Sequence, residues 1–152
     1  MSADKLYFDD MTVGRRFGSS SLRVERDAML DFARAYDPQP FHLDDAAAKA
    51  SLFGGLVASG WFTAALTMRL LVDALPMASG IIGAGMDELR WPKPVRAGDV
   101  LRAQSEVLEA RISRRRPDQG VIKMRTTTLN QNDDPVQIFL ANLFVPRRPG
   151  AV

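Results

Sequence analysis

The chain has 152 residues, 46% of them hydrophobic and 25% charged, which indicates one globular domain rather than a disordered chain. Its formal net charge of +2 is too small to argue for nucleic acid as a partner, although it mildly favours an anionic ligand. The chain has no cysteine, which excludes disulfides and zinc–thiolate sites and fits the reducing cytoplasm in which we expect the protein.

The first third of the chain predicts one strand followed by helices. Residues 12–24 alternate loosely between polar and apolar, which is typical of an opening strand. From about Arg26 the apolar residues recur at helical spacing, which predicts a helix of some three turns that Pro38 must end. A short helix is expected over residues 46–50, with Asp44 and Asp45 before it, at the positive end of its dipole.

The longest predicted helix begins after its N-cap residue Ser59, runs to Leu75 and is stopped by Pro76. Apolar residues surround most of its axis, and Arg69 and Asp73 form its only charged pair. Such a helix must be buried on most sides, so we expect it at the centre of the fold. It is too short and too charged to span a bilayer, and we expect a soluble protein with no membrane partner.

After residue 80 the apolar period falls to two, which predicts strands. Four such strands are expected, over residues 80–91, 99–112, 120–131 and 135–146. The last one alternates little, which suggests burial on both faces. The sequence therefore predicts an α+β fold in a single domain over residues 1–152, in which an antiparallel sheet wraps around the long helix and residues 147–152 form a short tail.

The only histidine, His42, follows an aspartate by five residues in the stretch Asp37-Pro38-Gln39-Pro40-Phe41-His42. The two prolines keep the connector from 37 to 40 out of the helical conformation, so a carboxylate and an imidazole emerge at the two ends of a stiff segment. A general acid–base pair needs such a preset separation. On the spacing alone, the simpler interpretation is that both side chains cap helix ends.

This stretch resembles the D-x-N-P-x-H signature of the MaoC-like hydratases, the R-specific enoyl-CoA hydratase family with a hotdog fold. Two further blocks resemble the family in the same order: Phe53-Gly54-Gly55-Leu56-Val57-Ala58-Ser59-Gly60-Trp61 and Arg90-Trp91-Pro92-Lys93-Pro94-Val95-Arg96-Ala97-Gly98-Asp99-Val100-Leu101. The resemblance extends roughly from residue 8 to 146, and the three blocks together favour catalysis over capping. Gln39 stands where the family usually has asparagine, and Ser59 stands where a histidine often precedes the glycine.

The resemblance implies catalytic roles for three residues. Asp37 and His42 would hold a water between them. Asp37 would take the proton of the water, while His42 would orient the water and share the relay that delivers hydrogen to the alpha carbon. The backbone N–H of Gly60 would hold the thioester oxygen as negative charge builds on it, although close packing at a helix start is the simpler explanation of a glycine. The residues expected to contact the substrate are Gln39, Phe41, Ser59, Trp61 and Lys93.

The sequence supports other candidate sites less strongly. We expect Arg114-Arg115-Arg116 to form a solvated hairpin tip, with a contact to coenzyme A phosphates as the alternative for these arginines and for Lys93 and Arg96. One histidine and no cysteine leave no credible metal site. A Ser-His-Asp triad would need the imidazole that is already assigned to the site of Asp37, so Ser59 is expected to be a cap rather than a nucleophile.

The resemblance implies an enzyme of fatty acid metabolism that adds water reversibly to a 2-enoyl-CoA, giving the R-3-hydroxyacyl-CoA, and that needs no cofactor. It also implies a homodimer or a multiple of one. Two alternatives stay open. A hotdog thioesterase would direct the water at the carbonyl carbon, and an acyl-CoA-binding subunit would have lost activity, a possibility that Gln39 keeps open.

Overall fold

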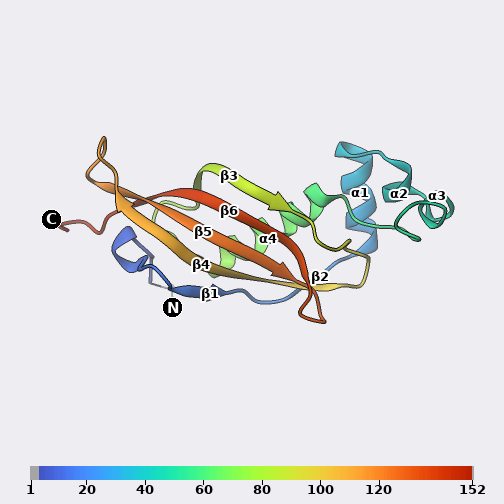
Figure 1. Cartoon of the computed structure of the whole chain (residues 1–152), viewed down its shortest axis with the longest axis horizontal. Helices are drawn as coiled ribbons and strands as arrows, with labels where there is room; N and C mark the ends of the chain where they lie inside the picture. The colour runs from blue at the N-terminus through green and yellow to red at the C-terminus, as the bar shows by residue number, and fades with distance from the viewer. Residues whose placement is uncertain (1–3, 152) are drawn as a thin grey trace.

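The computed structural model describes residues 4–151, and its main feature is an antiparallel six-stranded sheet that arches over one long helix, α4 (Gly60–Ala74) (Figure 1). A single 3-10 turn, η1 (Phe8–Asp10), precedes the sheet. The other elements, in chain order, are β1 (Arg16–Gly18), β2 (Leu22–Arg23), α1 (Arg26–Tyr36), α2 (Pro40–Leu43), α3 (Asp45–Lys49), β3 (Ile82–Arg90), β4 (Val100–Ile112), β5 (Gln119–Leu129) and β6 (Pro135–Pro146).

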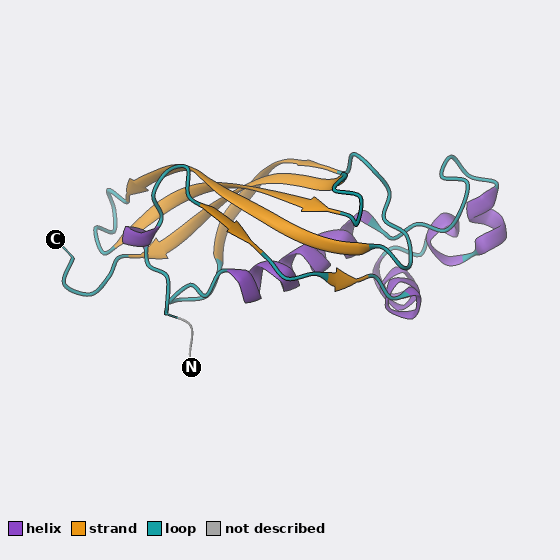
Figure 2. Ribbon diagram, turned by 90° about the horizontal axis from the view of Figure 1, so that it is seen from below, coloured by secondary structure: helices purple, strands orange, loops and turns teal. Residues whose placement is uncertain are grey.

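The sheet has the strand order β1-β4-β5-β6-β3, with β2 also paired to β4. The strand that follows α4 along the chain, β3, therefore lies at one edge beside the last strand, β6. The next strand, β4, lies on the far side of β5, next to the two short strands of the N-terminal segment. This crossover brings residues before and after α4 together along the sheet, and the helix lies beneath the arch in Figure 2.

Helix α4 packs one face against the inner face of the sheet. Its buried residues are Phe62, Thr63, Thr67, Leu70 and Leu71. The expectation that the helix is buried on most sides is wrong for a single chain, because the sheet covers only this one face. Three large apolar side chains on the helix stay open to solvent: Trp61 is 59% exposed, Met68 44% and Val72 50%. No helix within residues 4–151 is long and apolar enough to cross a membrane.

The N-terminal segment differs from its prediction in two places. The expected strand over residues 12–24 is two short strands, β1 and β2, which pair with separate parts of β4. The sequence analysis did not predict the single turn of α2, where Pro40 is the first helical residue. Proline suits this position because its missing N–H would have no intrahelical partner there. Helices α1, α2 and α3 gather beyond one end of the sheet, near the start of α4 (Figure 1).

Candidate active site

Asp37 and His42 meet at the start of α4. Helix α1 ends at Tyr36, so Asp37 is its C-cap residue, and its N–H donates to Ala33 O at 2.9 Å. The single turn of α2 then brings His42 back, and its Nε2 lies 3.2 Å from Asp37 Oδ2. Both side chains are largely withdrawn from solvent, with 8% of His42 and 17% of Asp37 exposed. The stiff connector inferred from the two prolines thus places the carboxylate and the imidazole in direct contact.

The imidazole of His42 is held in one orientation by the backbone of the loop before α4. Its Nδ1 lies 2.8 Å from Val57 O. A carbonyl oxygen only accepts, so Nδ1 carries a hydrogen, and Nε2 is the nitrogen free to exchange a proton with Asp37. The N–H of Val57 in turn donates to Phe41 O at 3.2 Å, which ties the loop to α2. The ring of Phe41 meets that of His42 edge-on, with centroids 4.6 Å apart.

Two further donors hold the carboxylate of Asp37. Ser59 Oγ donates to Oδ2 at 2.7 Å, and Gln39 Nε2 donates to Oδ1. Burial opposes ionisation of Asp37, but the hydrogen bonds from Ser59 and Gln39 and the neighbouring His42 outweigh it and hold the pKa of this carboxyl below its usual value. The longer side chain of Gln39 therefore still delivers an amide to the carboxylate, although an asparagine is usual there in the family it resembles.

The predicted N-cap role of Ser59 is confirmed, since its Oγ accepts from the N–H of Trp61 at 3.2 Å. The N–H groups of Phe62 and Thr63 both donate to Ser59 O. This leaves the N–H of Gly60 as the one in the first turn of α4 that has no hydrogen-bond partner within residues 4–151. Such a group, at the positive end of the helix dipole, can bind an oxygen that gains negative charge.

A pocket of about 370 Å³ opens beside His42 and Gly60. Aromatic and apolar side chains form most of its wall. Its lining residues are Phe41, His42, Phe53, Val57, Ala58, Gly60, Thr63, Trp91, Pro92, Lys93, Pro94 and Val95. An apolar wall with few polar groups at one end is typical of a site for a small-molecule ligand.

Four of the predicted site residues line this pocket: Phe41, His42, Gly60 and Lys93. Three others, Asp37, Gln39 and Ser59, are not among its lining residues and connect to it through the contact of Asp37 with His42. The eighth, Trp61, is more than half exposed and lies edge-on to the ring of Trp91. Within the pocket wall, Lys93 forms an ion pair with Asp134 at 2.6 Å.

The sequence analysis missed Trp91 and Thr63 as lining residues. Trp91 follows β3 directly and precedes a Pro-Lys-Pro bend. This bend lies inside the third block of the family resemblance, which was the one sequence signal that could have pointed to Trp91. Nothing in the sequence distinguished Thr63 from the other residues of α4.

The basic residues considered for coenzyme A phosphates differ in their surroundings. Arg96 donates from Nη2 to Phe53 O at 2.7 Å and from Nη1 to Leu56 O at 3.4 Å, so it holds the loop that carries Val57. The run of residues 114–116 lies in the exposed turn between β4 and β5, and the predicted solvated hairpin tip is confirmed.

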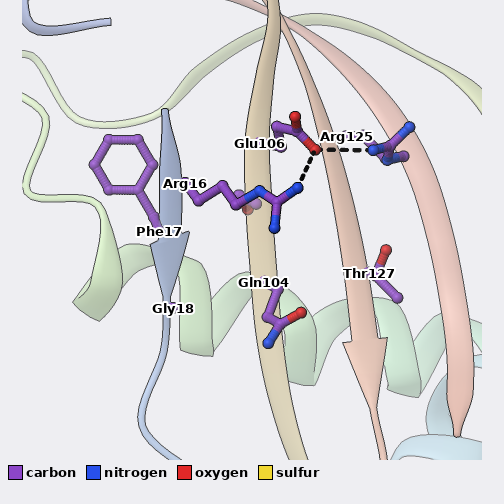
Figure 3. A pocket seen from close by; sticks show the side chains of 8 residues that line it. Arg16, Phe17, Gly18, Gln104, Glu106, Arg125 and Thr127 are labelled. Carbon is purple, nitrogen blue, oxygen red and sulfur yellow. Dashed lines mark hydrogen bonds and ion pairs between the residues drawn. The ribbon is translucent and has the colours of Figure 1, made fainter. Parts of the chain in front are cut away.

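A second pocket, of about 360 Å³, lies on the outer face of the sheet (Figure 3). Its charges are paired: Glu106 Oε2 accepts from Arg125 Nη2 at 2.9 Å and lies 3.8 Å from Arg16 Nη2. The strands separate this pocket from α4 in Figure 3, and neither a histidine nor a helix start lines it. The pocket beside His42 is therefore the candidate active site.

Comparison with known proteins gives a consistent picture. The family described as MaoC like domain matches residues 10–130, which is more than half of the chain. The crystal structure of a MaoC-like dehydratase from Rhodospirillum rubrum is 53% identical, with a TM-score of 0.91, and the match covers 95% of this chain and 99% of that chain. This likeness confirms the predicted hotdog fold.

Of two relatives found by sequence, one is named only as uncharacterized and the other is named for an enzyme activity. The uncharacterized protein YdeM of Bacillus subtilis is 33% identical over 138 residues, which cover 90% of this chain and 95% of YdeM. The 3-hydroxybutyryl-CoA dehydratase of Methylorubrum extorquens is 32% identical over 114 residues, which cover 73% of this chain and 69% of that protein.

The lowered pKa of Asp37 predicts a pH dependence of stability with a definite sign. The stabilising contribution of this carboxylate is fully present above its ordinary pKa of 3.8 and is lost as the pH falls through the lower folded value. We therefore expect the free energy of unfolding of the wild type to exceed that of Asp37→Asn near neutral pH, and the excess to shrink below about pH 4. Urea unfolding at stepped pH measures this difference. A constant excess down to roughly pH 2 would show that the charge of Asp37 does not stabilise the fold.

Proposed function

Because the chain belongs to the MaoC-like family of hydratases and dehydratases, we propose that it adds water reversibly to a 2-enoyl-CoA, giving the R-3-hydroxyacyl-CoA. The observation that carries this proposal is the contact of His42 Nε2 with Asp37 Oδ2. His42 and Gly60, the first residue of α4, line the same pocket. The relative named 3-hydroxybutyryl-CoA dehydratase supports a short acyl thioester as the substrate.

The proposed reaction needs three actions from these residues. The N–H of Gly60 binds the thioester oxygen, which draws electrons from the double bond and makes the beta carbon electrophilic. Asp37, whose carboxylate is ionised at neutral pH, takes a proton from a water as the oxygen of that water bonds to the beta carbon. His42 Nε2 shares this proton and passes it to the alpha carbon. Hydroxyl and hydrogen both come from the water, so the balance needs no cofactor.

The water has a different place from the one first expected. Asp37 Oδ2 and His42 Nε2 are 3.2 Å apart and in direct contact, so a water cannot lie on the line between these two atoms. In the proposed mechanism it lies beside the pair, on the pocket side of His42. The hydrogen bonds from Gln39 and Ser59 to Asp37 hold its carboxylate in one orientation beside His42, which supports an active enzyme over a subunit that has lost activity.

The pair of Asp37 and His42 gives the first test. We expect Asp37→Asn and His42→Ala each to lower kcat by ~10²–10⁴-fold, since each removes one partner of the proton transfer. The double variant should lose little beyond the worse single variant, because the two groups act as a unit. The measurement is the loss of absorbance of the conjugated enoyl thioester, with circular dichroism as the check on folding.

The matched control for this test is Glu106→Gln, which also replaces a carboxylate by its amide. Glu106 pairs with arginines on the outer face of the sheet, so we expect kcat to stay at the wild-type value. Wild-type activity in His42→Ala would contradict the assignment.

The reaction class has its own test, in which enoyl-CoAs of short and medium chain length are mixed with the enzyme. We expect the conjugated double bond to disappear without release of free thiol, and the product hydroxyl to have the R configuration on a chiral column. Thiol release faster than alkene loss would identify a thioesterase. Silence in both assays, together with a gain in stability of about 2.7 kcal/mol at a hundredfold excess of ligand over Kd, would identify a binding subunit.

We also propose that two chains join through the edge strand β3 and the uncovered face of α4. Nearly every residue of β3 is exposed, and Ile82 and Met86 are each 47% exposed. The uncovered Met68 and Val72 of α4 add apolar surface. An open edge strand with apolar side chains invites pairing with another sheet, and apolar surface of this kind is usually covered by a partner.

Light scattering tests this assembly. We expect a mass of two chains, or a multiple of two, at micromolar concentration for the wild type. Met86→Asp should shift the mass toward one chain, because a carboxylate would be buried unpaired in the interface. Asp118→Asn, in the exposed turn between β4 and β5, is the control and should leave the mass unchanged. An active wild-type monomer would refute the proposed assembly.

A further inference from the structure

Helix α4 starts directly against the indole of Trp91, with no side chain between them. A Cβ added to Gly60 would lie 2.6 Å from Trp91 Cε2 and 2.8 Å from Cδ2 and Cζ2. These separations are far below van der Waals contact, so the ring occupies the space that any side chain at position 60 would need. The backbone of Gly60 therefore rests on the face of this one ring, and the position of the ring sets how closely the first turn of α4 approaches the end of β3.

Trp91 is itself anchored near the start of β6, the strand that pairs with β3. Its Nε1 donates to Gln137 Oε1 at 2.9 Å, and Gln137, on β6, is completely buried. An indole nitrogen can only donate, so this bond also decides which end of the amide is the oxygen. The ring of Trp61 meets that of Trp91 edge-on, with centroids 5.3 Å apart, and Trp91 is 41% exposed.

Burial of the Gln137 amide lowers the stability of the fold. Its Nε2 is buried and has no hydrogen-bond partner within residues 4–151. An unpaired buried donor destabilises a fold, and an apolar side chain of the same length would avoid this cost. The contact that the amide does make is the one that orients Trp91, which points to a role of Gln137 in placing that ring.

We propose that Trp91 and Gln137 are positioning residues, which together hold the N–H of Gly60 at the place where the thioester oxygen gains its charge. This inference rests on the proposed hydratase function and adds a part that the Asp37–His42 pair does not supply. A donor of this kind must lie ~2.7–3.1 Å from the developing oxyanion, and a misplacement of about 1 Å can cost ~10²-fold in rate. Trp91 also lines the pocket, whereas Gln137 does not, so the two residues can be separated by experiment.

The test uses Gln137→Met, Trp91→Phe and the double variant in the full chain. Gln137→Met keeps the length of the side chain and removes the acceptor, so we expect kcat per folded enzyme to fall by about tenfold while KM stays close to the wild-type value. Trp91→Phe removes the donor and part of the pocket wall, so both kcat and KM should change. Steady-state kinetics well below the melting temperature, Tm, provide these values.

The double variant separates positioning from simple stabilisation. Neither polar partner remains to be left unpaired, so we expect its Tm to rise above that of Trp91→Phe, in which both polar atoms of Gln137 are buried without a partner. Its kcat should stay as low as that of the worse single variant, because the ring is still unanchored. Recovery of kcat together with Tm would mean that the bond only stabilises the fold and would overturn the proposal.

The matched control is Thr126→Val, which breaks another buried bond of the same interior. Thr126 Oγ1 lies 2.7 Å from Ser105 Oγ, and neither residue lines the pocket beside His42. We expect Tm to fall while kcat per folded enzyme is retained. An equal loss of kcat in this variant would show that the rate follows overall stability and would contradict a special role for Gln137.

The contact with Gly60 has a test of its own. Gly60→Ala should lose most of kcat because its methyl group collides with the indole. Trp91→Ala should lower kcat in the wild-type background yet raise it in the Gly60→Ala background, since removing the ring relieves the collision. Equal losses in both backgrounds would overturn the inference. A wild-type enzyme that leaves the enoyl double bond intact would refute the proposed function and this inference with it, whereas normal kcat in Gln137→Met refutes the inference alone.

Discussion

The hydroxyl of Ser59 is the link on which the site depends. It donates to the carboxylate of Asp37 and accepts from the N–H of Trp61, so one side chain joins the end of the α1 segment to the first turn of α4. Without this link the carboxylate and the N–H of Gly60 would belong to two separate parts of the chain. With it, the base and the proposed oxygen-binding group keep one geometry, as acid–base chemistry on a small substrate requires.

Polar contacts elsewhere in the fold serve the same local geometry. Arg96 holds the carbonyls of Phe53 and Leu56, and the next residue along that loop, Val57, orients the imidazole of His42. On the other side of the pocket, Gln137 anchors the ring on which Gly60 rests. Guanidinium and amide groups cost free energy when they are withdrawn from water. The hydrogen bonds of Arg96 fix a backbone segment that borders the pocket, and the hydrogen bond of Gln137 fixes a ring that lines it.

The single chain leaves part of its apolar surface uncovered. One face of α4 packs beneath the sheet, while Met68 and Val72 are exposed, as is the edge strand β3. The sequence of α4 is apolar nearly all round, so it suits a helix that is covered on both sides, by its own sheet and by a second chain. The apolar composition of this helix is therefore consistent with the proposed assembly of two chains.

The local features of the chain could be predicted because they follow from short-range sterics and periodicity. The prolines at 38 and 40 set the connector between Asp37 and His42, and Ser59 caps α4. Apolar residues that alternate in three of the four long strands, and run nearly continuously in the last, mark those strands. Three ordered blocks were also enough to indicate the fold family. These predictions needed only residues close together in the chain.

The tertiary structure decides which residues far apart in the sequence come into contact, and no local pattern encodes these contacts. The hydrogen bond of Nδ1 to Val57 spans 15 residues, that of Ser59 to Asp37 spans 22, and that of Trp91 to Gln137 spans 46. The last of these bonds depends on the strand order, which places β3 beside β6. The contact of the indole with Gly60 arises in the same way, because packing of distant segments, and not sequence spacing, sets the distance between them.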